Sequence, residues 1–157
     1  MEYDIRKARP TDIDDLINLC AAHAAHEQAD YSPDGKAENL SRELFSPHPK
    51  LRCLVVETAN GIVGYATFTK DYSTWDAAEF AYLDCLFLQP EARNFGIGEA
   101  LIREIAKIMV SENCLLMQWH TPPFNTRAIK FYRRIGATSK EKVRFYLDEN
   151  TLKQLAS

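Results

Sequence analysis

One short stretch constrains the fold of this chain more than any other. Residues 93–98, Arg-Asn-Phe-Gly-Ile-Gly, join an apolar run at 80–88 to an amphipathic run at 99–110. The order strand, glycine-containing turn, helix collects unpartnered backbone N–H groups at the positive end of a helix dipole. The glycines let the backbone turn sharply and approach a ligand closely, and the arginine adds forked cationic donors. The stretch therefore predicts a phosphate-binding turn.

The turn differs from two well-known phosphate loops. No pair of glycines five apart is followed by Lys and Ser or Thr, which excludes a Walker A loop. A dinucleotide-binding fingerprint needs a small residue where this chain has Leu101. The remaining pattern is Arg-x-x-Gly-x-Gly. Taken alone, this pattern also fits a strand-to-helix turn that uses glycine for geometry only and binds no phosphate.

A second motif follows one predicted strand later. Residues 124–137 read Phe-Asn-Thr-Arg-Ala-Ile-Lys-Phe-Tyr-Arg-Arg-Ile-Gly-Ala. The two motifs, in this order and spacing, resemble the GNAT superfamily of N-acetyltransferases over nearly the whole chain. Tyr72, Trp75 and the Tyr-Leu-Asp at 82–84 are similar to the spermidine/spermine N-acetyltransferase branch. The resemblance implies a single domain over 1–157, with a mixed, mostly antiparallel α/β sheet flanked by helices on both faces.

Composition limits the partners. The chain has 157 residues, is 46% hydrophobic and 26% charged, and carries a formal net charge of −3, so we expect a soluble domain that does not bind nucleic acid. The start of the chain is acidic and no apolar run is long enough for a membrane span, so we expect neither a signal peptide nor a membrane partner. The four cysteines are far apart and fit the reduced core of a cytoplasmic protein without a metal.

Hydrophobic periodicity predicts the order of the elements. Strands are expected at 3–6, 53–57, 62–68, 78–88, 114–120 and 143–147, and helices at 13–26, 37–45, 99–110 and 148–155. A further helix is capped by Asn125 and ended by Gly136, and the Asn-Gly at 60–61 predicts a hairpin.

Acetyl transfer from a thioester to an amine needs a neutral amine and a protonated leaving thiolate. The resemblance assigns the removal of the amine proton to Asp84, at a position where the polyamine branch has a Glu. Asp is one methylene shorter, so a relay through water is expected in preference to direct proton abstraction; a substrate contact, or an Asp facing solvent at a strand bend, are the alternatives. Tyr132 matches the family's general acid, and a plain helix-core tyrosine is its alternative. No cysteine falls on a motif position, which favours direct attack in a ternary complex.

The resemblance also assigns acetyl-CoA, as co-substrate, to three groups of residues. They are the strand end Leu86, Phe87 and Leu88, through its backbone; the turn Arg93, Asn94, Phe95, Gly96, Ile97, Gly98 and Glu99; and Asn125, Ala128 and Tyr132.

The acceptor is expected to lie against Tyr72, Trp75, Asp84 and Glu27. Tyr72 and Trp75 could contact a cation through their rings, and Glu27 could supply negative charge or merely keep a loop soluble. Ser73 stands where the branch has an acid, which weakens a polyamine assignment.

Three histidines have alternative interpretations. His23 and His26 have a spacing that suits metal binding, but no further ligand completes a set, so helix-surface histidines are favoured. His120, at a strand end, is a second base or, preferentially, a hydrogen-bonded strand-end residue.

The sequence thus predicts N-acetylation of a small cationic amine, polyamine-like or amino-acid-like, by a homodimeric enzyme. The alternatives are acetylation of a protein N-terminus, a lysine or an antibiotic amine, and a CoA-binding module without turnover.

Overall fold

The computed structural model describes all residues, Met1–Ser157, as two compact units, Met1–Asn125 and Thr126–Ser157. The first unit contains β1 (Asp4–Lys7), α1 (Ile13–His26), α2 (Lys36–Leu44), β2 (Arg52–Thr58), β3 (Gly61–Ser73), β4 (Ala78–Leu88), α3 (Ile97–Ser111) and β5 (Met117–Gln118), with short 3-10 helices η1 (Pro10–Asp12) and η2 (Pro90–Ala92). The second unit contains α4 (Thr126–Arg134) and α5 (Glu149–Ala156). A single domain over the whole chain stays a prediction. None of the helices combines the length and apolar character that a membrane crossing requires.

The five strands form one sheet in the order β1-β2-β3-β4-β5. The first three pairings are antiparallel, and β4 pairs with β5 in parallel. The predicted mixed, mostly antiparallel sheet is therefore confirmed.

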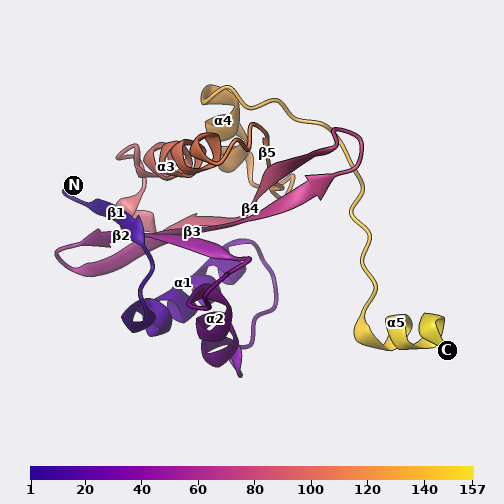
Figure 1. The fold of residues 1–157 in the computed structure, drawn as a ribbon. Coiled ribbons are helices and arrows are strands. Elements are labelled where there is room, and N and C mark those ends of the chain that lie inside the picture. Colours follow the sequence, from indigo (N-terminus) through magenta and orange to yellow (C-terminus); the bar gives the residue numbers. More distant parts are fainter. The chain divides into compact units, whose positions relative to one another are not determined.

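Helices cover both faces of this sheet, as predicted (Figure 1). Alternate residues of β2 show the two layers, because side chains alternate across a strand. Leu54 and Val56 pack in a cluster with Leu101 of α3, whereas Cys53 and Val55 pack in another cluster with α1 and α2. We call these two sides of the sheet the α3 face and the α1 face.

Two predicted strands differ in the structure. The strand expected at 114–120 shortens to Met117–Gln118, which pair with Ala81 and Tyr82, because the chain leaves the edge of β4 beyond this pair. The strand expected at 143–147 does not form: these residues have no regular secondary structure, and Val143 and Phe145 are exposed. Alternating apolar residues describe the two faces of a strand, but a strand also needs a neighbour to receive its backbone hydrogen bonds.

Candidate active site

Asp84 lies on a β-bulge in the middle of β4. Opposite it, Thr67 of β3 is paired with Cys85 and Phe68 with Leu83, so Asp84 is the extra residue without a partner. An inserted residue breaks the alternation of side chains along a strand. Leu83 consequently packs on the α3 face, whereas both Asp84 and Cys85 line a pocket on the α1 face.

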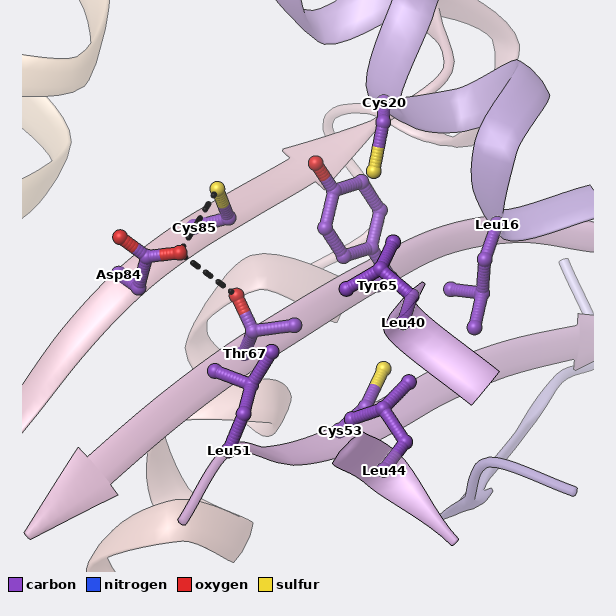
Figure 2. Close-up of a pocket in the computed structure, with 10 residues that line it drawn as sticks. All are labelled: Leu16, Cys20, Leu40, Leu44, Leu51, Cys53, Tyr65, Thr67, Asp84 and Cys85. Carbon is purple, nitrogen blue, oxygen red and sulfur yellow. Dashed lines mark hydrogen bonds between the residues drawn. The ribbon is translucent and has the colours of Figure 1, made fainter. Parts of the chain in front are cut away.

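The Asp84 carboxylate is exposed at one side of this pocket (Figure 2). Its Oδ2 accepts from Thr67 Oγ1 at 3.5 Å and from the Cys85 thiol at 3.6 Å. The Thr67 contact is long and the thiol is a weak donor, so these two contacts leave most of the acceptor capacity of the carboxylate for other donors. The bulge therefore puts two consecutive side chains, Asp84 and Cys85, on the α1 face, where an unbroken strand would have placed only one of them.

The outer edge of β4 is open from just before the bulge onwards. Its pairing with β5 ends at Tyr82, while its pairing with β3 continues to Leu88. The amide of Gln89 donates to Val63 O on the β3 side, at 2.9 Å. Because N–H groups alternate in direction along a strand, the amides of Leu88 and Leu86 point to the open edge. These are the backbone groups to which the resemblance assigns the pantetheine arm.

The predicted phosphate turn follows this open edge. Asn94 has φ 71° and Gly96 has φ 77°, and α3 begins at Ile97, with Gly98 in its first turn. The Gly96 N-cap has no side-chain oxygen to accept from the first-turn amides, which suits binding of an external anion. A left-handed conformation at the N-cap favours glycine there.

Arg93 fastens the turn to the strand that precedes it. Its Nε donates to Leu88 O at 2.9 Å, and its guanidinium lies 5.5 Å from the centre of the Phe87 ring. Within the predicted CoA-binding turn, Phe95 is half-exposed, and Glu99 forms an ion pair with Arg103 at 2.7 Å. The turn and the open edge are therefore continuous, with Arg93 bridging them.

A hydrogen-bonded chain on the α1 face was not predicted from the sequence. Glu27 Oε1 lies 3.4 Å from His23 Nε2, and His23 Nδ1 lies 3.0 Å from the Tyr65 hydroxyl. The Tyr65 hydroxyl in turn contacts the thiols of Cys20 and Cys85. Glu27, which we predicted to bind substrate, is thereby connected to the pocket that contains Asp84.

Burial sets the protonation states of these hydrogen-bonded side chains. It lowers the pKa of His23, with Glu27 opposing the shift, and raises the pKa of Tyr65 and Cys20. Burial, reinforced by the Asp84 charge, raises the pKa of Cys85 to about 12. The thiols and the phenol are therefore neutral at physiological pH, and His23 is shifted towards its neutral form.

Sequence patterns could have indicated only part of this hydrogen-bonded network. Tyr65 and Thr67 share one side of the strand predicted at 62–68, so both fall on one face. Their meeting with His23 depends on how α1 packs on the sheet, which periodicity does not predict.

Two predicted substrate contacts lie away from Asp84 along the sheet. Tyr72 is paired with Glu79, and Trp75, which is 98% exposed, lies in the turn between β3 and β4. A strand rises about 3.3 Å per residue, which places Tyr72 roughly 17 Å along β4 from Asp84. Within this chain, the structure does not bring these aromatic rings to the pocket.

The remaining predicted residues belong to the end of the first unit and to α4 of the second. Asn125, the last residue of the first unit, donates its backbone N–H to Pro122 O at 2.9 Å. Ala128 and Tyr132 lie on α4 of the second unit, where the Tyr132 ring is 5.1 Å from that of Phe131. Their contacts with CoA, and the role of Tyr132 as general acid, stay predictions.

The other histidines have local partners. His120 Nδ1 lies 3.1 Å from the Tyr82 hydroxyl, in agreement with a hydrogen-bonded residue after the strand. His26 lies 6.2 Å from the ring of Phe87, centre to centre. No group of three or more His, Cys, Asp or Glu side chains has the arrangement of a metal site.

A mixed sheet that opens at a bulge and leads into a phosphate turn is the architecture expected of a GNAT acetyltransferase. Comparison with known proteins agrees. The sequence model described as "Acetyltransferase (GNAT) family" matches residues 15–137, which is more than half of the chain. The chain therefore belongs to this family and is an acetyl-CoA-dependent N-acetyltransferase.

Similar proteins include enzymes named for small amines. The chain is 28% identical over 141 residues to thialysine N-epsilon-acetyltransferase of Mus musculus, covering 85% of this chain and 82% of the relative. It is 24% identical to spermidine/spermine N(1)-acetyltransferase-like protein 1 of Homo sapiens, covering 86% of this chain and 20% of that protein. The fold is similar to that of aminoglycoside N-acetyltransferase AAC(6')-Iy, with a TM-score of 0.78, 22% identity, and coverage of 94% and 95% of the two chains.

Proposed function

We propose that this enzyme transfers an acetyl group from acetyl-CoA to the amino group of a small cationic amine, by direct attack in a ternary complex. The observation that carries the proposal is the position of Asp84. The bulge directs its carboxylate into a pocket at the point where β4 loses its β5 neighbour. A carboxylate there attracts an ammonium group and takes its proton, directly or through a water molecule, before the nitrogen attacks. The names of two relatives, a thialysine acetyltransferase and a spermidine/spermine acetyltransferase-like protein, support this class of acceptor.

The same region has the features that acetyl-CoA requires. The outward amides of Leu86 and Leu88 suit the amide-containing pantetheine arm, and the turn from Arg93 to the first turn of α3 suits the pyrophosphate. The arm would then run beside the bulge, which brings the thioester close to the amine that Asp84 holds.

Direct transfer is favoured over an acetyl-cysteine intermediate. Cys85 is the thiol beside Asp84, and burial holds its pKa at about 12. Because the thiolate is the nucleophilic form, a thiol that stays protonated is a poor acetyl acceptor.

The test is thiol release from acetyl-CoA with a panel of acceptors: alkylamines, diamines, amino acids with a side-chain amine, an aminoglycoside, and peptides with a free N-terminus or lysine. We expect the highest kcat/KM with a small amine. A higher kcat/KM with peptides, or tight CoA binding without turnover of any acceptor, would contradict the proposal and favour one of the alternatives.

Tyr132 is proposed as the general acid that protonates the leaving thiolate. Tyr132→Phe keeps the ring and removes only the donor, so we expect kcat to fall by about 10²–10⁴-fold. Acetyl-CoA affinity, measured by calorimetry, should change little, because the acid acts mainly in the transition state. The control is Tyr146→Phe, since Tyr146 is exposed. A normal kcat in a folded Tyr132→Phe enzyme, with chemistry limiting turnover, would assign the proton to water.

A homodimer in the cytoplasm is proposed by analogy with the polyamine branch and from the four free cysteines. Light scattering at micromolar concentration tests the dimer, and a monomer alone would exclude it. Fractionation of cells that express the protein tests the compartment.

A further inference from the structure

The pocket beside Asp84 has mostly apolar walls, and its polar lining residues are Asp84, Thr67, Tyr65 and three cysteines. Leucines from α1, α2 and the chain before β2 form its walls: Leu16, Leu40, Leu44 and Leu51. In Figure 2 the Asp84 carboxylate lies at the left of the group and Leu16 at the right. We call this space the leucine pocket.

Asp84 is the only charged side chain that lines the leucine pocket. The thiols of Cys20, Cys53 and Cys85 also face it, and burial keeps all three protonated by raising their pKa. The pocket therefore offers one negative charge, at Asp84, and no second negative charge that could neutralise a second cation.

The pocket is also small. Its volume is about 70 Å³. One water-sized occupant needs about 15 Å³ of cavity volume, so the pocket has room for about five non-hydrogen atoms. An amino nitrogen at Asp84 followed by a chain of about four carbon or sulfur atoms has this size.

We propose that the leucine pocket holds an uncharged aliphatic segment of the acceptor, with the reacting ammonium at Asp84. The enzyme then selects amines with a single positive charge near the reacting end, and disfavours diamines of the same length. This inference rests on the proposed function, and it narrows the substrate class of the same site.

Two opposite effects produce this selectivity. Each methylene that enters the leucine pocket is removed from water, which strengthens binding by about fourfold. A second ammonium among Leu40, Leu44 and Leu51 would lose its hydration without gaining a counter-charge, which is costly for an isolated cation. A diamine must either pay this desolvation cost or leave its chain outside the pocket.

The experiment compares kcat/KM of the wild-type enzyme for n-alkylamines and α,ω-diamines from two to eight carbons, at one pH. For the alkylamines we expect a rise of about fourfold per carbon up to roughly four carbons, and then a plateau or fall. We expect n-butylamine to exceed 1,4-diaminobutane by about 100-fold, because only the diamine carries the unpaired charge. Equal or better turnover of the diamine would overturn the inference.

A pair of variants at Leu40 locates the effect in the pocket. Leu40 of α2, like Leu51, is half-buried and lies outside the two core clusters, so it is a wall position that should tolerate substitution. Leu40→Glu places a counter-charge in the wall and should raise the ratio of diamine to monoamine kcat/KM by about 10-fold or more. Leu40→Gln, of the same shape without the charge, should not favour the diamine.

The outcomes separate this inference from the proposed function. An unchanged ratio in a folded Leu40→Glu enzyme would place the acceptor chain elsewhere and overturn the inference alone. If Leu40→Glu does not fold by circular dichroism, the wild-type series still decides. Absence of turnover with every amine would overturn the proposed function, and the inference with it.

Discussion

The two faces of the sheet use the same strands for different purposes. On the α3 face, aliphatic and aromatic side chains meet α3 in a dry core, and Leu101, Ile105 and Ala66 have no exposed surface. On the α1 face, the core includes the Tyr65 hydroxyl, and His23 and Asp84 lie beside it. Polar groups in a core cost stability unless they are hydrogen-bonded.

This difference indicates that the two faces of the sheet have different roles. The α3 face packs α3 against the sheet and thereby positions the start of α3, where the predicted phosphate turn lies. The α1 face accepts polar groups because Tyr65 and His23 satisfy each other at 3.0 Å and leave the pocket in front of Asp84. Substitutions on the α3 face should therefore change folding, and substitutions on the α1 face should change chemistry.

The largest effect is expected at Asp84. Asp84→Asn keeps the shape of the side chain but removes its charge and basicity, so kcat/KM for a small amine should fall by about 10²–10⁴-fold. CoA affinity and thermal stability should change little, because the side chain is exposed. The matched control is Glu104→Gln on α3, where an acid pairs with Lys107 on the protein surface. Activity near that of the wild type in Asp84→Asn would remove this residue from the reaction.

A substitution in the core of the α3 face should have the opposite effect and mainly lower the stability of the fold. Leu101 is 0% exposed, and Leu101→Ala should lower the free energy of unfolding by about 2–5 kcal/mol through lost burial and a residual cavity. Tyr65→Phe, on the α1 face, should cost only about 1–2 kcal/mol, because it keeps the ring and loses one hydrogen bond. Urea denaturation followed by circular dichroism measures both values. Similar losses from the two variants would contradict the distinction between the faces.

The phosphate turn is tested by its second glycine. Gly98→Val adds a branched side chain in the first turn of α3 and should weaken CoA binding by about 10-fold or more, as a loss of roughly 1.4 kcal/mol or more would. Gly98→Ala should have an intermediate effect. Lys107→Val, on the exposed surface of the same helix, controls for helix propensity. Unchanged CoA affinity in calorimetric titration of folded Gly98→Val would indicate that this glycine serves geometry only.

The smallest expected effect is the pH dependence of the α1 face. His23 faces Glu27, His26, Tyr65 and Asp84, and burial lowers its pKa below the usual value of about 6.5. The unfolded chain therefore binds a proton that the folded chain resists, so stability should fall as pH drops through about 6.5 towards the folded pKa. His23→Gln should flatten this slope, whereas His26→Gln, at an exposed position, should keep it. Urea midpoints measured between pH 8 and pH 5 would contradict the assignment if both variants kept the wild-type slope.

Much of the fold followed from local patterns. The apolar run before residues 93–98 and the amphipathic run after them predicted β4, the turn and α3, because hydrophobic periodicity and glycine content are local properties. The Asn-Gly at 60–61 likewise predicted the hairpin between β2 and β3. The strand expected at 143–147 had the same kind of pattern, but it lacks a partner in this chain.

The sequence by itself determined the order of most elements, the glycine-containing turn before α3 and the presence of an acid in the fourth strand. Tertiary structure decided which face that acid serves, because the bulge at Asp84 exists only in the register between β3 and β4. It also decided that His23 meets Tyr65, 42 residues away. Periodicity assigns a side chain to a face within its own element, but register and helix packing depend on contacts between distant segments, and those contacts build the pocket.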